Sequence, residues 1–309
     1  MPAKKENTIV KQEVIAKPFL KWAGSKRQLL SKFETLYPQA LKAGKIKNYY
    51  EPFLGSGAVF FNIVQRYTVE NAFLSDVNPA LVLTYQVIQA NVSKLVDVLS
   101  MHQKRYDALP QQGRLQYFYQ QRDEFNQQRF DENFTAKNSK GINRAAQVIF
   151  LNRTCYNGLF RVNSKGIFNT PAGRYINPSI CDVENLQAVS ALLRKATIQK
   201  ADFTTTLKKV MPNSLVYIDP PYRPLSKTAN FTAYSKSAFG DKEQAQLAKL
   251  YRKLDAKGAL LMLSNSDTED GFFDKLYQGF NLTRVPARRL INARVTGRGA
   301  VNELVVTNY

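Results

Sequence analysis

Residues 49–62, YYEPFLGSGAVFFN, predict a strand, a tight glycine turn and a helix in immediate succession. Gly55 and Gly57 permit the turn and let a ligand approach the backbone closely. The stretch is not a complete G-x-G-x-x-G, because Phe60 takes the third position, and the chain contains no P-loop. Taken alone, it is better explained by an ordinary turn between a strand and a helix.

Asp76 adds to the argument because it ends the next apolar stretch, AFLSD. Nucleoside-binding folds carry an acid for the ribose about 20 residues after the glycine turn, and such an acid can accept hydrogen bonds from both hydroxyls. The alternative role for Asp76 is to cap the helix that begins with NPALV. The turn and the acid together favour a nucleoside cofactor. Without a phosphate-binding pattern, S-adenosylmethionine fits better than NAD.

The segment PFLKWAGSKRQLL, residues 18–30, contains the only tryptophan, Trp22, and also Lys26. We predict that both lie at the methionine end of that cofactor, where a cation can pair with its carboxylate. The alternative is a core aromatic residue followed by a solvated Lys26-Arg27 pair.

Strand-like and helical segments alternate on both sides of a middle region of different composition. Strands are predicted over 48–53, 71–75, 197–202, 214–219, 258–266 and 302–309, and helices over 58–67, 79–102, 186–196 and 241–258. This alternation predicts an α/β fold with a mostly parallel sheet covered on both faces. Residues 86–189, rich in Gln, Tyr, Phe and Arg, predict an inserted, largely helical module, and residues 1–17 a flexible basic arm.

The charge of the chain indicates a polyanionic partner. It has 44 Lys and Arg against 24 Asp and Glu, a formal net charge of +20. Nucleic acid is favoured over a membrane surface, because no basic amphipathic helix or lipidation motif is present. No apolar run is long enough to span a membrane, and the N-terminus lacks the apolar region of a secretory signal.

Two cysteines and a single histidine restrict the chemistry. Cys155 and Cys181 form no disulfide or zinc framework, and His102 alone argues against a metal site or a serine–histidine triad. We therefore expect no metal and a reducing, cytoplasmic compartment.

The stretch SLVYIDPPY, residues 214–222, ends an apolar strand at an acid. Pro220 has a fixed φ and Pro221 restricts the residue before it, so the Asp219 side chain and the Pro220 carbonyl are aimed at one point. Two acceptors there suit an amino group with two N–H bonds, and Tyr222 offers a face on which a base can stack. The alternative is a proline-stiffened turn beside a core strand.

An exocyclic amine such as adenine N6 is a poor nucleophile, because its lone pair is delocalised into the ring. Two acceptors that hold its hydrogens favour a pyramidal nitrogen, which can attack a sulfonium methyl in line. A base inside a duplex cannot reach such a pocket, so it has to be flipped out.

These segments, in this order, resemble the Dam family of N6-adenine DNA methyltransferases (D12 class), especially its DpnM-like members that accompany restriction systems. The resemblance runs from about Pro18 to Tyr309 and also includes FLNRTCYNGLFRVNSKGIFNTPAGRY, FTAYSKSAF, LMLSNS and NELVVTNY. It implies a Rossmann-like, S-adenosylmethionine-dependent catalytic domain, residues 18–85 and 190–309. Residues 86–189 would form the target-recognition domain inserted into it.

The resemblance also implies roles for individual residues. The expected cofactor contacts, which include the two glycines of the turn, are Trp22, Lys26, Phe53, Gly55, Gly57, Asp76, Asp202, Phe203 and Asp219. Asp202 and Phe203 would hold the adenine of the cofactor; their alternatives are a polar turn residue and a core aromatic residue. The catalytic set is Asp219, Pro220, Pro221 and Tyr222.

In family members that read GATC, matching segments contact DNA. Lys21 would contact a guanine, Tyr156 would insert at the gap left by the flipped adenine, and Asn157 would help to hold the disrupted pair. Leu159, Arg161 and Pro171 would meet the remaining bases, although Arg161 could instead contact a phosphate, which carries no sequence information.

Three features depart from the family pattern, and one of them is the extra basic arm of residues 1–17. Ile167 stands where many members have an acid, which affects the details of this loop. The C-terminal segment adds arginines that could contact phosphates or be solvated, namely Arg288, Arg289, Arg294 and Arg298.

We therefore predict an adenine-specific DNA methyltransferase (EC 2.1.1.72) that acts on duplex DNA, with GATC as the expected site. We expect a monomer in a prokaryotic or phage-encoded restriction–modification system, whose endonuclease acts separately on the same site. The alternatives are methylation of an amino group in RNA or on a protein glutamine, and a DNA-binding protein without catalysis.

Overall fold

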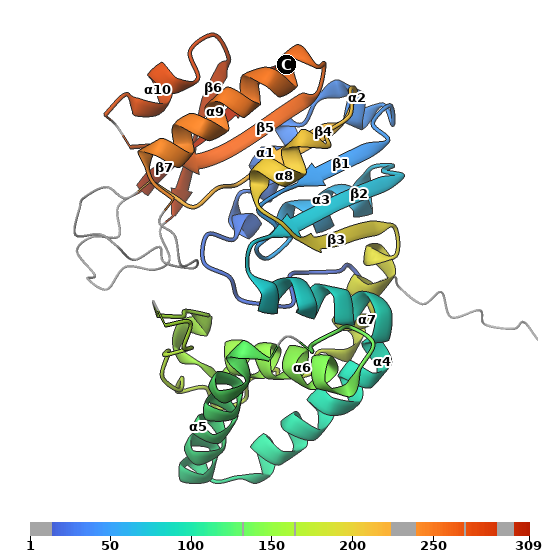
Figure 1. The fold of residues 1–309 in the computed structure, drawn as a ribbon, viewed down its shortest axis with the longest axis vertical. Coiled ribbons are helices and arrows are strands. Elements are labelled where there is room, and N and C mark those ends of the chain that lie inside the picture. The colour runs from blue at the N-terminus through green and yellow to red at the C-terminus, as the bar shows by residue number, and fades with distance from the viewer. Residues whose placement is uncertain (1–13, 132, 164, 224–238, 269, 289–299) are drawn as a thin grey trace, which may run out of the picture.

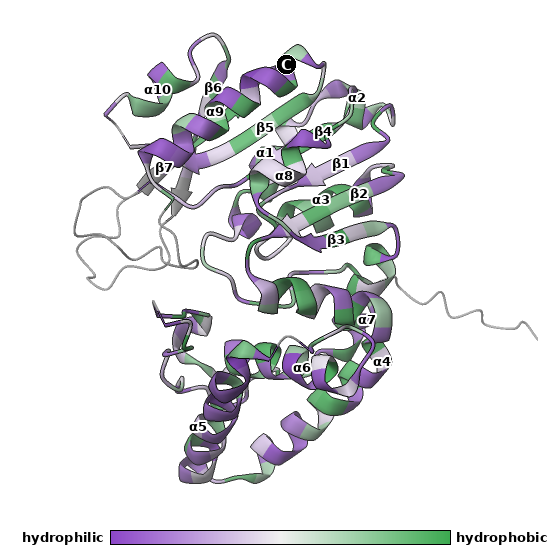
Figure 2. Cartoon of the chain, in the orientation of Figure 1, coloured by the Kyte–Doolittle hydropathy of each residue, from purple (hydrophilic) through white to green (hydrophobic). Residues whose placement is uncertain are grey.

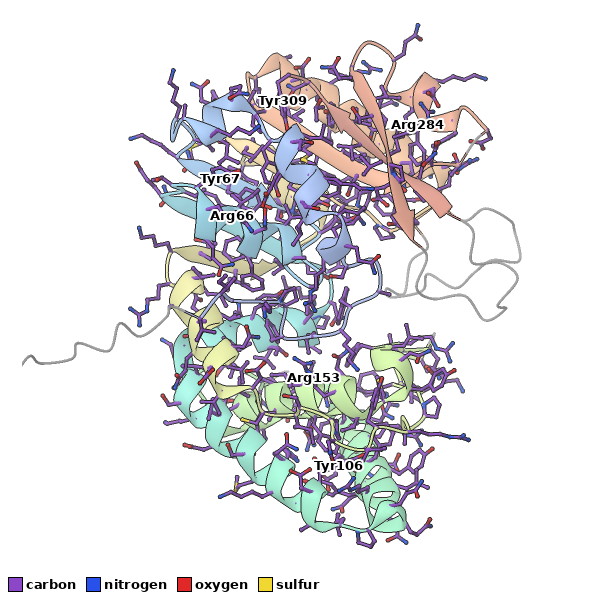
Figure 3. All side chains as sticks on the ribbon, turned by 180° about the vertical axis from the view of Figure 1, so that it is seen from behind. Arg66, Tyr67, Tyr106, Arg153, Arg284 and Tyr309 are labelled. Carbon is purple, nitrogen blue, oxygen red and sulfur yellow. The ribbon has the colours of Figure 1, made fainter. Side chains whose placement is uncertain are left out.

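A computed structural model describes residues 14–131, 133–163, 165–223, 239–268, 270–288 and 300–309. A sheet covered by helices forms one part of the molecule, and a helical module adjoins it (Figure 1). In the reverse view of Figure 3, Tyr106 lies in the helical module and Tyr309 at the opposite end of the molecule. Within the described residues, no helix is both long and apolar enough to cross a membrane.

The seven-stranded sheet has the order β3-β2-β1-β4-β5-β7-β6. Its strands are β1 (Asn48–Glu51), β2 (Asn71–Asp76), β3 (Ala196–Lys200), β4 (Leu215–Ile218), β5 (Leu260–Ser266), β6 (Asn281–Arg288) and β7 (Ala300–Thr307). The first five in sequence run parallel to one another, whereas β7 pairs antiparallel with both β5 and β6. The predicted α/β fold with a mostly parallel sheet is confirmed, and β6 was not predicted.

Alternation along the strands builds a core on each face of the sheet. Tyr49 and Tyr217 face the core shared with α1 (Leu30–Leu36), α3 (Ala58–Arg66) and α7 (Val183–Leu193). Tyr50 and Val216 face a second core, shared with α8 (Phe203–Lys208), α9 (Asp241–Ala256) and α10 (Phe272–Leu276). The short helix α2 (Gln39–Lys42) precedes β1.

The helical module is built from α4 (Pro79–Ala108), α5 (Gln111–Gln127) and α6 (Ser139–Thr154). Figure 2 shows α5 as largely hydrophilic, and it buries only a narrow set that includes Tyr117, Phe118 and Phe125. The backbone of α4 departs from helical geometry at Asn91, whose side chain donates to the Ala136 carbonyl. This break lies near the predicted domain boundary at residue 85, so α4 joins the two parts.

The residues at the ends of two helices, α4 and α9, show how these helices are capped. The N-cap of α4 is Asn78, whose side chain accepts from the backbone N–H of Ala80 and of Leu81. Asp76 therefore does not have the alternative role of capping this helix. After α9, Gly258 has a φ of +80°, the left-handed conformation that glycine commonly adopts just past the end of a helix.

Candidate functional site

Three acids lie at the carboxyl edge of the sheet. Asp76 ends β2, Glu51 ends β1 and Asp219 follows β4, and these strands are neighbours in the sheet. Because they are parallel, their carboxyl ends open on the same side, which is where open α/β sheets bind ligands. The structure thus brings the two predicted acids, Asp76 and Asp219, to the two sides of one strand.

The glycine turn holds Asp76 in place. The backbone N–H of Gly55 donates to Oδ2 of Asp76 (3.1 Å), and the N–H of Asn78 donates to Oδ1 (2.9 Å). Burial raises the pKa of Asp76, and these backbone bonds oppose the rise. Both Gly55 and Gly57 have positive φ, at 47° and 66°, so the turn needs glycine. The turn and the acid fit the ribose of a nucleoside cofactor.

The loop that carries Trp22 and Lys26 crosses the glycine turn. The Ser25 and Ser56 hydroxyls share a hydrogen bond of 2.8 Å. A Cβ at Gly55 would lie 3.2 Å from Cδ1 of Trp22, so the indole ring packs against the turn. Trp22 also stacks on Phe160, with 5.8 Å between the ring centroids.

Lys26 lies at the other end of that loop and contacts the Asp-Pro-Pro-Tyr motif. It is buried, and Nζ donates to Oδ1 of Asp219 (2.6 Å), to the Tyr222 hydroxyl (3.1 Å) and to the Gly24 carbonyl (3.1 Å). Oε1 of Glu303 lies 3.3 Å from the same nitrogen. Lys26 therefore joins the loop of the expected cofactor site directly to the catalytic motif.

Charge pairing sets the ionisation of this cluster. Burial alone would lower the pKa of Lys26, but Asp219 and Glu303 hold it well above its usual value. Burial raises the pKa of Asp219 and of Glu303, and Lys26 opposes both rises. The stable arrangement is a charged Lys26 shared by two carboxyl groups.

The motif itself is rigid and partly accessible. Oδ1 of Asp219 also accepts from the Ser264 hydroxyl (3.3 Å), which bonds to Tyr217 in turn. Within the described residues Oδ2 of Asp219 accepts no hydrogen bond, and the side chain is 19% exposed. Pro220 is buried, and the Pro221 carbonyl accepts from the side chain of Gln244. An acceptor is thus held at the strand end with room for a donor.

An aromatic group lies beside the glycine turn. Phe53 and Phe203 stack with centroids 5.5 Å apart, and Phe239 packs edge-on against both rings. Asp202 is exposed and caps α8 by accepting from the N–H of Thr204. Asp202 therefore caps a helix, which is a common role for a polar turn residue. Its side chain remains accessible beside the stacked rings of Phe53 and Phe203.

The predicted DNA-contacting residues gather on loops around the end of α6. Asn152 is buried and joins two of them: it bonds to both backbone groups of Lys21 and to the Gly158 carbonyl. Lys21 is exposed, with Nζ 4.1 Å from the centre of the Tyr175 ring. Tyr156 is 56% exposed, so its ring is accessible to a ligand.

The segment after Tyr156 is a short hairpin. Asn157 has a φ of 54°, and Val162 pairs with Phe168 to close the hairpin. Arg161 is exposed, and its Nε donates to Oδ1 of Asn169. Leu159 and Ile167 are partly buried, whereas Pro171 is exposed and accepts from the N–H of Tyr156 through its carbonyl.

Several residues of this site were missed from sequence. Glu303 follows Asn302 in a strand that is otherwise mostly apolar. An acid in such a strand was the only feature of the sequence that could have marked it as a site residue. Asn152 and Phe239 have no local pattern that marks them. Among the C-terminal arginines, only the backbone of Arg288 is described, and Arg289, Arg294 and Arg298 lie outside the described residues. So does FTAYSKSAF apart from Phe239.

Across the described ranges, no group of three or more His, Cys, Asp or Glu side chains could hold a metal ion.

Comparison with known proteins identifies the class as DNA methyltransferases that act on adenine. The family model for D12 class N6 adenine-specific DNA methyltransferase matches residues 22–291. The chain belongs to this family, and it is an adenine-specific DNA methyltransferase (EC 2.1.1.72).

Several relatives are similar in sequence to this chain along nearly their whole length. Type II methyltransferase M.MjaIII of Methanocaldococcus jannaschii is 48% identical over 95% of this chain and 99% of its own. Type II methyltransferase M1.LlaDCHI of Lactococcus lactis subsp. cremoris is 34% identical over 98% and 99%. A DNA adenine methylase of Serratia marcescens is 36% identical over 93% and 96%.

Proposed function

We propose that this methyltransferase uses S-adenosylmethionine to methylate N6 of a flipped adenine, with GATC as its site in duplex DNA. One observation carries the proposal: Lys26 links the Trp22 loop at the glycine turn to Asp219, so the expected cofactor and catalytic sites adjoin. The family membership favours DNA adenine over RNA or a protein glutamine as substrate.

The residues present fit the proposed cofactor. Asp76, fixed by two backbone N–H groups, would accept the ribose hydroxyls, and Phe53 and Phe203 would lie beside the adenine. Lys26 donates to Asp219, Tyr222 and the Gly24 carbonyl in this structure, so it would hold the carboxylate of the methionine part only by giving up one of these three bonds. When bound, S-adenosylmethionine supplies an electrophilic methyl group on a sulfonium, so the enzyme needs no nucleophile of its own.

The catalytic residues would act on the amine of the base. Asp219 and the Pro220 carbonyl accept its two hydrogens, which aims the nitrogen lone pair and stabilises the positive charge that develops on it. Tyr222 provides the stacking face. The proton leaves the nitrogen after transfer, and Asp219, as one of the two groups that would accept its hydrogen bonds, would receive it.

The remaining parts of the proposal concern target and setting. Residues 18–85 and 190–309 would form the catalytic domain and residues 86–189 the target-recognition domain. The helices α4 and α7 continue across both boundaries. Lys21, Tyr156, Asn157, Leu159, Arg161 and Pro171 would read the site. We propose a cytoplasmic monomer that accompanies a restriction endonuclease, in keeping with relatives named Type II methyltransferases.

Methyl transfer from tritiated S-adenosylmethionine tests the assignment. Duplexes that contain GATC should be labelled, and matched duplexes with one base pair of the site changed should not. Equal labelling of both would refute the GATC assignment, and labelling of RNA in preference to DNA would refute the substrate. Sequencing of methylated adenines after expression in a methylation-free host identifies the site independently.

A further inference from the structure

Glu303 lies on β7, which runs antiparallel to its neighbours β5 and β6 in the sheet, and it brings a buried carboxyl group into the site. Its side chain is 5% exposed. Carboxyl groups are rarely buried this far without a specific partner, because burial disfavours their charged form. Its position is therefore informative, and none of the roles assigned above to cofactor or base accounts for it.

Its two oxygens have different surroundings. Oε2 accepts a hydrogen bond of 2.8 Å from the Tyr222 hydroxyl. Oε1 lies 3.3 Å from Nζ of Lys26, and within the described residues it makes no hydrogen bond. The best-formed contact of Glu303 is thus to Tyr222 rather than to Lys26.

The hydroxyl of Tyr222 is held from two sides. It donates to Glu303 and accepts from Nζ of Lys26 at 3.1 Å, while that nitrogen lies 4.8 Å from the centre of the ring. A rotation of the ring away from this position breaks both hydrogen bonds. Such prior ordering reduces the conformational entropy that a tyrosine loses when a base stacks on it.

We propose that Glu303 is a positioning residue for methyl transfer: by accepting from the Tyr222 hydroxyl, it holds the ring in the orientation that stacks on the target base. This inference rests on the proposed function, because it assumes that Tyr222 contacts the base. A purely structural Glu303 would instead serve only to balance the buried charge of Lys26, and its loss would affect stability without affecting the bound base.

Single-turnover methyl transfer at saturating DNA and cofactor separates these roles. Tyr222→Phe keeps the ring and removes the hydroxyl, and Glu303→Ala removes the acceptor. Each should slow transfer by about 10- to 100-fold with a DNA dissociation constant within about threefold of the wild type. Glu303→Gln retains an acceptor oxygen and should recover most of the rate.

The double variant gives the sharpest test. If both residues act through one hydrogen bond, Glu303→Ala with Tyr222→Phe should be no slower than the slower single variant, within about threefold. Losses that multiply would overturn the inference. So would a wild-type rate for Tyr222→Phe, a result that does not depend on whether Glu303→Ala folds.

Two controls complete the design. Glu70→Gln alters an exposed glutamate paired with Lys47, and its rate and urea unfolding should match the wild type. Asp219→Ala tests the proposed function itself. Normal transfer by Asp219→Ala would refute the catalytic assignment and the inference with it. Loss of transfer by Asp219→Ala together with a normal rate for Glu303→Ala would refute the inference alone.

Discussion

At the level of single residues, Lys26 governs the electrostatics of the site. It is the one cation among the side chains that the described structure places in contact with Asp219, and a second carboxyl group, Glu303, lies beside it. Two acids and one base leave the cluster short of positive charge. The charge on Lys26 is therefore strongly favoured.

Asp219→Ala should abolish methylation while leaving much of the DNA affinity. In the proposed mechanism the side chain supplies one of the two acceptors for the reacting amine, and loss of such a group commonly costs about 10²- to 10³-fold in rate or more. Tritiated methyl transfer and fluorescence anisotropy measure the two properties. Near-normal turnover would show that Asp219 does not act on the amine.

Arg161→Ala should relax specificity at one base of the site. An arginine bidentate to guanine contributes about 1–3 kcal/mol of discrimination at that position. The measurement compares transfer rates on duplexes substituted at each position. Arg66→Ala, on α3 and paired with Glu34, is a suitable control away from the helical module (Figure 3). A uniform loss across all duplexes would instead identify Arg161 as a phosphate contact.

Glu51 predicts a pH dependence of stability. It is buried and bonded to the Tyr49 hydroxyl (2.6 Å), and burial raises its pKa to about 8. The folded protein binds the Glu51 proton more tightly than the unfolded chain does. The stability contributed by protonated Glu51 is therefore complete below pH ~4.5 and is lost as the pH rises through about 8.

Glu51→Gln mimics the protonated form, so this variant should gain stability over the wild type as the pH increases. The difference in unfolding free energy should be near zero at pH ~4.5 and on the order of 4 kcal/mol at pH ~8, because each unit of pKa shift corresponds to about 1.4 kcal/mol. Urea unfolding at several pH values measures it. A difference that is independent of pH would mean that Glu51 is ionised in the folded protein.

At the level of elements, the turn between β1 and α3 leaves little room for a side chain at Gly57. Gly57 and Gly44 have the same φ of 66°, but their surroundings differ. A Cβ at Gly57 would lie 2.7 Å from the Tyr85 hydroxyl, which itself donates to the Gly55 carbonyl, whereas a Cβ at Gly44 meets nothing within 4 Å.

Gly44→Ala should therefore cost only the strain of the left-handed conformation, about 1–2 kcal/mol. Gly57→Ala should cost more, because the Tyr85 hydroxyl must move and lose its bond to the turn. The Gly57→Ala substitution should also weaken cofactor binding, measured by calorimetry, whereas Gly44→Ala should leave that binding unchanged. Equal effects of the two substitutions would show that the close approach of Tyr85 is unimportant.

The edge strand β6 shows why some elements escaped prediction. Its sequence, NLTRVPAR, contains Pro286, which argues against a strand in the interior of a sheet. The structure places β6 at the edge, paired only with β7, where a proline is tolerated. The local sequence does not reveal which strand has a free edge, because that depends on the order of all seven.

At the level of the whole molecule, the net charge of +20 should make DNA binding strongly dependent on salt. A protein that makes about six to ten phosphate contacts loses roughly 10³- to 10⁵-fold in affinity between about 50 and 200 mM salt. Anisotropy with a GATC duplex and an unrelated duplex should give similar steep slopes, because phosphate contacts are common to both. A slope near zero would place the positive charge away from the DNA.

The sequence by itself determined the features that are local along the chain. Alternating apolar patterns predicted the α/β class, the glycines the turn before α3, and Asp-Pro-Pro-Tyr a rigid strand end. The order of these segments indicated the methyltransferase family that the comparison confirmed. Periodicity and backbone restriction act over a few residues, so they can be recognised without knowledge of the fold.

Only the tertiary structure decided which distant side chains share a site. Lys26 and Asp219 are 193 residues apart, and Tyr222 and Glu303 are 81 apart. No pattern in the chain connects such pairs. They meet because β4, β5 and β7 are neighbours in one sheet and the Trp22 loop is tied to the glycine turn. The partners of Lys26 and the burial of Glu303 are therefore consequences of strand order, which depends on the packing of the whole sheet.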